Sequence, residues 1–99
     1  MGATLSIDEL SQIIKPILDR YHAEGAALFG SYARGQATPD SDVDLIVYGG
    51  DSFEKTDVFA IAEDLFQASG KRVDVYEESE IDEQSDLHRE ILRDRLVIA

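Results

Sequence analysis

The sequence predicts an α/β domain in which a small β-sheet is flanked by helices. Two observations predict it: apolar residues at helical spacing alternate along the chain with short apolar runs of strand length, and glycines end several of these segments. A chain of 99 residues is long enough for one domain with a modest core, and too short for two. We therefore interpret residues 1–99 as a single domain.

The first helix is predicted from its start signal and its periodicity. Ser6 and Glu9 have the spacing of a capping box, in which each side chain accepts a hydrogen bond from the other residue's backbone N–H. Apolar residues then recur at helical spacing as far as Tyr21. Pro16 is expected to kink this helix, and Gly25 is expected to end it.

Two strands and a short helix follow. Residues 26–29 form an apolar run that predicts a buried strand, and Gly30 and Ser31 predict a turn into a short helix over residues 31–35. Residues 42–48 open with Asp and Val in alternation and continue apolar, which predicts a second strand.

The rest of the chain continues the alternation of helices and strands. The predicted elements are a helix over 53–69 ended by Gly70, a strand over 72–76, an acidic surface connection over 77–86, a helix over 87–95 and an edge strand over 96–98.

Composition and charge exclude several classes of function. The chain has 21 acidic and 9 basic residues, for a net charge of −12, so it lacks the basic face with which proteins hold nucleic acid phosphates. This charge suits docking onto a basic partner protein. The absence of cysteine excludes disulfides and thiolate metal sites. With no apolar run of about 20 residues and no signal-peptide pattern, we expect a cytoplasmic protein without a membrane span.

Three aspartates are the candidate reactive groups. Residues two apart in a strand point to the same face, so Asp42 and Asp44 should project together while Val43 points into the core. In the third strand, Val73 and Val75 point to one face and Asp74 points to the other. If the two strands are neighbours, the three carboxylates converge on one side of the sheet.

Such a cluster favours a divalent cation. Two like charges about 4 Å apart repel by roughly 4 kcal/mol at an effective dielectric constant near 20. A bound Mg²⁺ removes this repulsion, and carboxylate oxygens together with substrate phosphate are its usual ligands. The pattern therefore predicts chemistry on a nucleoside triphosphate.

The turn before the second strand is a candidate phosphate site. Gly30 allows the backbone to approach a ligand closely, and Ser31 would open the short helix with free N–H groups and one hydroxyl. Arg34 lies one turn further on and could reach a phosphate or product oxygen.

A calcium-binding loop is the alternative explanation of the aspartate spacing. Asp40, Asp42 and Asp44 match its first ligands. The loop also requires Gly at its sixth position and Glu at its twelfth, where this chain has Leu45 and Asp51. The sequence therefore excludes this reading.

The remaining histidines and aromatic residues have simpler explanations. His22 and His88 have no partner at ligand spacing and are expected at the surface. Tyr32, Phe53 and Phe66 are expected in the core rather than on a base-stacking surface.

Gly30-Ser31, a gap of ten residues and then Asp42-x-Asp44 resemble the signature of the DNA polymerase β-like nucleotidyltransferases. The fuller runs, residues 28–35 and 41–45, resemble the minimal nucleotidyltransferase (MNT) group in particular. The resemblance implies a small mixed sheet flanked by helices and an ATP-dependent nucleotidyltransferase activity. It also assigns roles to five residues: Asp42 and Asp44 as Mg²⁺ ligands essential for catalysis, Asp74 as a third metal ligand or the catalytic base, and Gly30 and Ser31 as the triphosphate site. Arg34 matches a residue that recurs in the family's run but has no settled role there.

The same resemblance implies a partner. In the MNT group the domain is typically an antitoxin that transfers AMP from ATP to a tyrosine of a toxin, a HEPN-domain ribonuclease. Larger relatives complete the nucleotide and acceptor sites with a further helical domain, which these 99 residues do not contain. We therefore expect a partner protein, or a second copy in a homodimer, to supply the remaining walls. Two alternatives stay open: an antitoxin that acts by binding alone, and a dimeric enzyme that modifies a small molecule such as an antibiotic.

Overall fold

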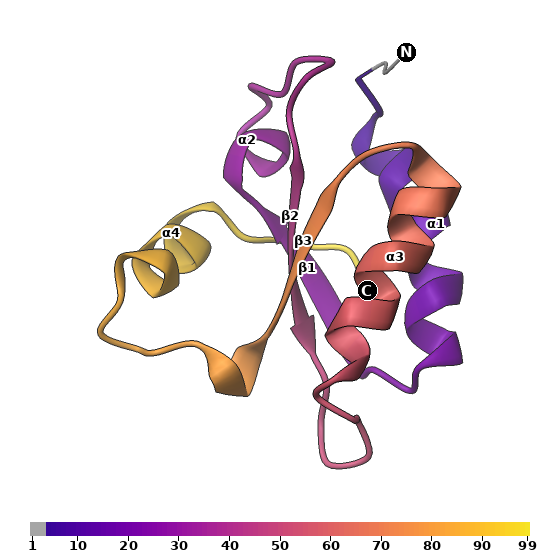
Figure 1. The fold of residues 1–99 in the computed structure, drawn as a ribbon. Helices are drawn as coiled ribbons and strands as arrows, with labels where there is room; N and C mark the ends of the chain where they lie inside the picture. Colours follow the sequence, from indigo (N-terminus) through magenta and orange to yellow (C-terminus); the bar gives the residue numbers. More distant parts are fainter. Residues whose placement is uncertain (1–3) are drawn as a thin grey trace.

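In the computed structural model, which describes residues 4–99, helices and strands alternate in the predicted order (Figure 1). The elements are α1 (Ile7–Arg20), β1 (Gly25–Phe29), α2 (Gly30–Ala33), β2 (Val43–Tyr48), α3 (Asp57–Ser69), β3 (Val73–Glu77), the 3₁₀ turn η1 (Glu78–Glu80), α4 (Asp86–Asp94) and β4 (Leu96–Val97). Among the described residues no helix is long and apolar enough to cross a membrane.

The four strands form one mixed sheet in the order β3-β2-β1-β4. β1 pairs antiparallel with both β2 and β4, whereas β2 and β3 run parallel. In Figure 1 the sheet is seen almost edge-on, with α1 and α3 on one side and α4 on the other. This arrangement confirms the predicted α/β class with a mixed sheet.

The main core lies between the sheet and the α1/α3 layer. It contains the inward-facing residues of the strands, among them Leu28, Val43 and Leu45, each fully buried. A smaller apolar cluster, with Phe29 and Ile46 at its centre, lies on the opposite face under α4. Successive residues of β1 and β2 therefore belong to different faces of the sheet, as strand geometry requires.

The short helix α2 covers Gly30–Ala33 rather than residues 31–35, and two other predicted helix boundaries were wrong by several residues. α1 ends at Arg20 with Tyr21 as its C-terminal cap, and Gly25 is the first residue of β1 rather than the end of the helix. α3 begins at Asp57, and Phe53 lies in the preceding loop. Phe53 is nonetheless buried, because its ring packs against the backbone of Gly49, where a Cβ atom would collide with it.

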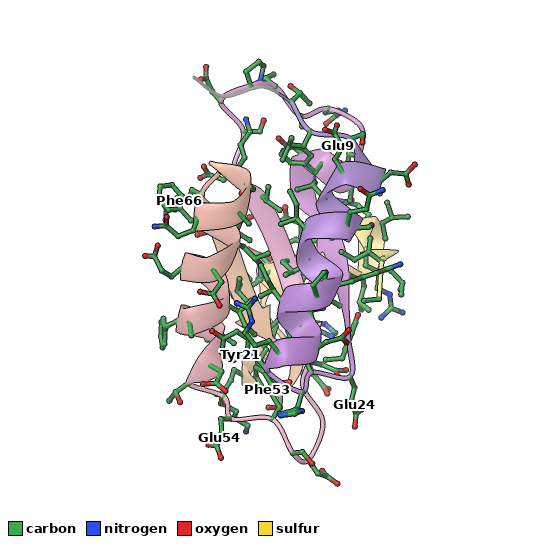
Figure 2. All side chains as sticks on the ribbon, turned by 90° about the vertical axis from the view of Figure 1, so that its right-hand side faces the viewer. Glu9, Tyr21, Glu24, Phe53, Glu54 and Phe66 are labelled. Carbon is green, nitrogen blue, oxygen red and sulfur yellow. The ribbon has the colours of Figure 1, made fainter. Side chains whose placement is uncertain are left out.

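Two predictions of exposure were also wrong. Phe66 is 48% exposed, and Figure 2 shows it projecting outward from α3, away from α1. Glu77, expected in the acidic surface connection, is instead the buried last residue of β3. Its carboxylate accepts hydrogen bonds from the backbone N–H groups of Ser79 (3.1 Å) and Gly49 (3.4 Å), which compensates for its burial.

Candidate active site

Gly30 connects β1 to the short helix α2 in a conformation that favours glycine. Its φ angle is +71°, in the left-handed region, and a Cβ atom at this position would collide with the carboxylate of Asp44. The contact arises because Phe29, the residue before Gly30, is paired with Asp44 in the antiparallel ladder. Both the turn and the close approach of the Asp44 carboxylate to the backbone therefore require glycine.

Asp44 and Asp74 occupy directly paired positions on the neighbouring parallel strands β2 and β3. Both are half-buried, and they alternate with core valines and leucines that face α1 and α3, so they share the α4 side of the sheet. Their predicted position on one face is confirmed. Asp42 lies one residue before β2 and is exposed.

The carboxylates around Asp44 outnumber the nearby cations, so negative charge is in excess at the site. Burial first, and then the nearby carboxylates of Asp74, Glu90 and Asp42, together raise the pKa of Asp44 from 3.8 to about 6, while Arg34 acts in the opposite direction. A cation beside Asp44 would oppose this shift, because it favours the ionised carboxylate. The oxygen donors present are those that Mg²⁺ prefers.

The carboxylates do not form a complete metal cage. Within residues 4–99 no three His, Cys, Asp or Glu side chains surround a common ion position. The predicted convergence of Asp42, Asp44 and Asp74 on one position is therefore not observed among these residues. Mg²⁺ usually takes one or two carboxylates and completes its coordination with water and substrate phosphates. The paired carboxylates of Asp44 and Asp74, with Asp42 just before β2, supply oxygen donors that fit an ion arriving together with a nucleotide.

Arg34 contacts α4. Its Nη1 donates to Asp94 Oδ2 at 2.6 Å and lies 3.8 Å from Glu90 Oε1. A hydrogen bond from Arg93, together with the one from Arg34, lowers the pKa of Asp94 to about 2. Sequence reasoning missed both Glu90 and Asp94. Their i, i+4 spacing placed them on one face of a helix, but nothing local showed that this face meets Arg34.

Lys71 is a third residue that sequence reasoning missed. It is buried, and its Nζ donates to the backbone carbonyl of Pro39 at 2.5 Å. The backbone N–H of Val43 also donates to the carbonyl of Arg72 at 2.9 Å. These two bonds fix the loop that carries Asp42 to the beginning of β3, and so to the strand that carries Asp74.

The start of α2 offers backbone donors near the carboxylates. Serine hydroxyls cap α1 at Ser6 and α4 at Ser85, whereas the residue that caps α2, Phe29, makes no such side-chain bond. The N–H groups that open α2, including that of the half-buried Ser31, therefore have no side-chain acceptor at this end of the helix.

A Gly-Ser turn beside paired aspartates on a mixed sheet defines a nucleotidyltransferase type of α/β domain. The sequence profile of the family described as "Polymerase beta, Nucleotidyltransferase" matches residues 12–99. The chain belongs to this family.

Individual relatives agree with this assignment. The chain is 30% identical over 96 residues to the protein adenylyltransferase MntA of Thermococcus cleftensis, covering 93% of this chain and 95% of the relative. A toxin-antitoxin crystal structure with AMP-PNP has a similar fold, with a TM-score of 0.77 at 21% identity over 90% of this chain and 72% of that one. An MNT antitoxin complex with a tri-AMPylated HEPN toxin of Shewanella oneidensis gives 0.70 at 18% identity, over 91% and 69% of the two chains.

Proposed function

We propose that this chain is a Mg²⁺-dependent protein adenylyltransferase, an antitoxin that transfers AMP from ATP to a tyrosine of a HEPN-type toxin in the cytoplasm. The observation that carries the proposal is the pairing of Asp44 with Asp74 directly beside Gly30 of the signature run. The Thermococcus relative is named for this activity. The Shewanella structure combines an MNT antitoxin with an AMPylated HEPN toxin.

The carboxylates and the turn would have different roles, one in binding the metal ion and the other in binding the triphosphate. Asp42 and Asp44 would hold the metal ion, and the backbone N–H groups after Gly30, with the Ser31 hydroxyl, would hold the triphosphate. When bound, Mg²⁺ would supply positive charge that offsets the negative charge developing on the pyrophosphate. Arg34 donates to Asp94 on α4, and it could reach a phosphate by giving up this bond and donating to a phosphate oxygen instead.

Asp74 would accept the proton of the acceptor hydroxyl. The tyrosine oxygen attacks the α-phosphorus in line and forms the new O–P bond, the bond to the bridging oxygen of the β-phosphate breaks, and pyrophosphate leaves. Asp74 is only half-buried and already lies 3.3 Å from Arg72 Nε. Its partial exposure leaves the carboxylate accessible to an acceptor hydroxyl.

The test is intact-mass spectrometry of a HEPN-type toxin after incubation with this chain, ATP and Mg²⁺. We expect an AMP-sized gain that requires Asp42 and Asp44 and is lost in Asp42→Asn and Asp44→Asn. Asp40→Asn, which removes an exposed acid from the same loop, is the matched control and should retain the gain. A toxin that is neutralised without any mass gain would show inhibition by binding alone, and AMP transfer to an antibiotic instead would show a small-molecule enzyme.

A further inference from the structure

The outer edge of β3 is open to solvent. β3 is the terminal strand of the sheet, and within residues 4–99 no strand pairs with its outer side. The N–H of Val43 in β2 donates to the carbonyl of Arg72, so the backbone groups of Arg72 point toward β2. Because a strand's backbone groups alternate in direction, the N–H and C=O groups of Val73 and Val75 therefore point away from β2, toward the open edge.

An apolar groove follows this edge between the two helical layers. Its main hollow, about 590 Å³, has Val58 and Phe59 of α3 on one side, Ile81 and Leu87 on the other, and Val75 at the strand. Smaller hollows extend it along β3. One is lined by Phe66 and Val73, and the other reaches Asp74. We call this surface, from Leu87 to Phe66, the β3 groove.

Two aromatic side chains of α3 border the β3 groove without being covered. Phe59 is 78% exposed and Phe66 is 48% exposed, and their i, i+7 spacing places them on one face of the helix. A large exposed apolar surface with polar residues at its rim usually marks a site where another molecule binds.

We propose that the β3 groove binds an extended segment of the acceptor protein as a fifth strand of the sheet. The proposal rests on the proposed function, and it adds where and how the tyrosine is presented. A residue of the added strand opposite Asp74 would face the α4 side, next to the carboxylates, with side chains about 4.5–5.5 Å apart. Its two neighbours would face Val73, Val75 and the aromatic residues of α3. The favoured acceptor is therefore a tyrosine between two apolar residues.

Charge selects the kind of partner. The main hollow is lined by three carboxylates, those of Glu77, Glu80 and Asp82, against the single ammonium of Lys55, which already lies 3.5 Å from Glu80. A second copy of this chain would bring the same acids and a further net charge of −12, so repulsion opposes a homodimer through this edge. A segment with basic residues flanking the tyrosine and its apolar neighbours is complementary.

The experiment measures binding of synthetic fluorescent peptides to the full chain by fluorescence anisotropy. The probe has a central tyrosine between two valines with arginines at both ends, and its comparison peptide has glutamates in place of the arginines. We expect the basic peptide to bind at least about tenfold more tightly than the acidic one, and Phe59→Asp to weaken its binding by about tenfold or more. Leu92→Asp, at a 51% exposed position on α4 outside the groove, should leave binding unchanged.

Hydrogen exchange locates the bound peptide. Pairing with β3 should protect the amides of Val73 and Val75, and Asp44→Asn should retain this protection while losing AMP transfer. Binding without AMP transfer by the wild-type chain would leave the docking proposal standing and reject the proposed function. Three results would overturn the docking proposal: no saturable binding, equal binding by Phe59→Asp, or sedimentation showing a homodimer that Phe59→Asp dissociates.

Discussion

The two faces of the sheet bury different kinds of residue, although the same strands form both. The α1/α3 face is apolar, and its strand residues, such as Val43 and Leu45, are fully buried. The α4 face has a smaller apolar cluster and also holds Asp44 and Asp74, half-buried beside each other. The comparison teaches that one face supplies the stability that lets the other hold like charges close together.

The largest expected effect is on activity at the α4 face. Asp44→Asn should lower AMP transfer by about a hundredfold or more, because the amide cannot supply the charge that holds the metal and the developing pyrophosphate. The same variant should unfold at an equal or higher urea concentration than the wild type at pH 7, because it removes a carboxylate whose ionisation is opposed by burial. Loss of stability together with activity would contradict the division between the faces.

The next residue along β2 should show the opposite behaviour. Leu45→Ala deletes a fully buried side chain from the α1/α3 face and should lower the free energy of unfolding by about 2–5 kcal/mol. Urea denaturation followed by circular dichroism measures the loss. The folded protein should keep the wild-type rate of AMP transfer when the rate is measured at a urea concentration well below the unfolding midpoint. A rate that falls in folded protein would show that the two faces are mechanically coupled.

The difference between the faces also explains what could be predicted from sequence. Period-two alternation in Asp42-Val43-Asp44 and in Val73-Asp74-Val75 placed the carboxylates on one face, because side-chain direction in a strand is a local property. The bonds from Arg34 to Asp94 and from Lys71 to Pro39 join segments 60 and 32 residues apart. No local pattern encodes them. Phe66 was expected in the core because it is aromatic, and it is still exposed, because residue type does not show what covers a side chain.

Two glycines with the same left-handed backbone conformation allow the cost of backbone strain to be measured separately from the cost of a steric clash. Gly30 and Gly35 have φ angles of +71° and +73°, but a Cβ atom would meet the Asp44 carboxylate at Gly30 and nothing within 4 Å at Gly35. Gly35→Ala should cost about 1 kcal/mol of stability through left-handed strain alone. Gly30→Ala should cost a further 1–3 kcal/mol or so, and it should also reduce AMP transfer by displacing Asp44. Thermal unfolding and the mass assay measure the two effects, and equal losses for both variants would contradict the crowding argument.

The charge on the α4 face predicts a pH dependence. The pKa of Asp44 is raised in the folded state from 3.8 to about 6. The contribution of this group to stability is therefore complete below about pH 4 and is lost as the pH rises through 6. Without metal, Asp44→Asn should match the wild type near pH 4 and become progressively more stable than it between pH 4 and 7. Urea midpoints at several pH values measure this difference. A constant difference across that range would show that Asp44 has its ordinary pKa.

The smallest expected effect lies between the helices of the opposite face. Tyr21, at the end of α1 (Figure 2), donates its hydroxyl to Asp64 Oδ2 of α3 at 2.6 Å, and Arg20 donates to the same oxygen at 3.1 Å. Tyr21→Phe should cost only about 1 kcal/mol, because Asp64 keeps Arg20 and stays accessible to water. AMP transfer should not change, since the bond lies behind the sheet from Asp44. Urea denaturation and the mass assay on the same preparation provide the check. A fall in AMP transfer without a change in stability would show that the α1/α3 layer helps to position the carboxylates.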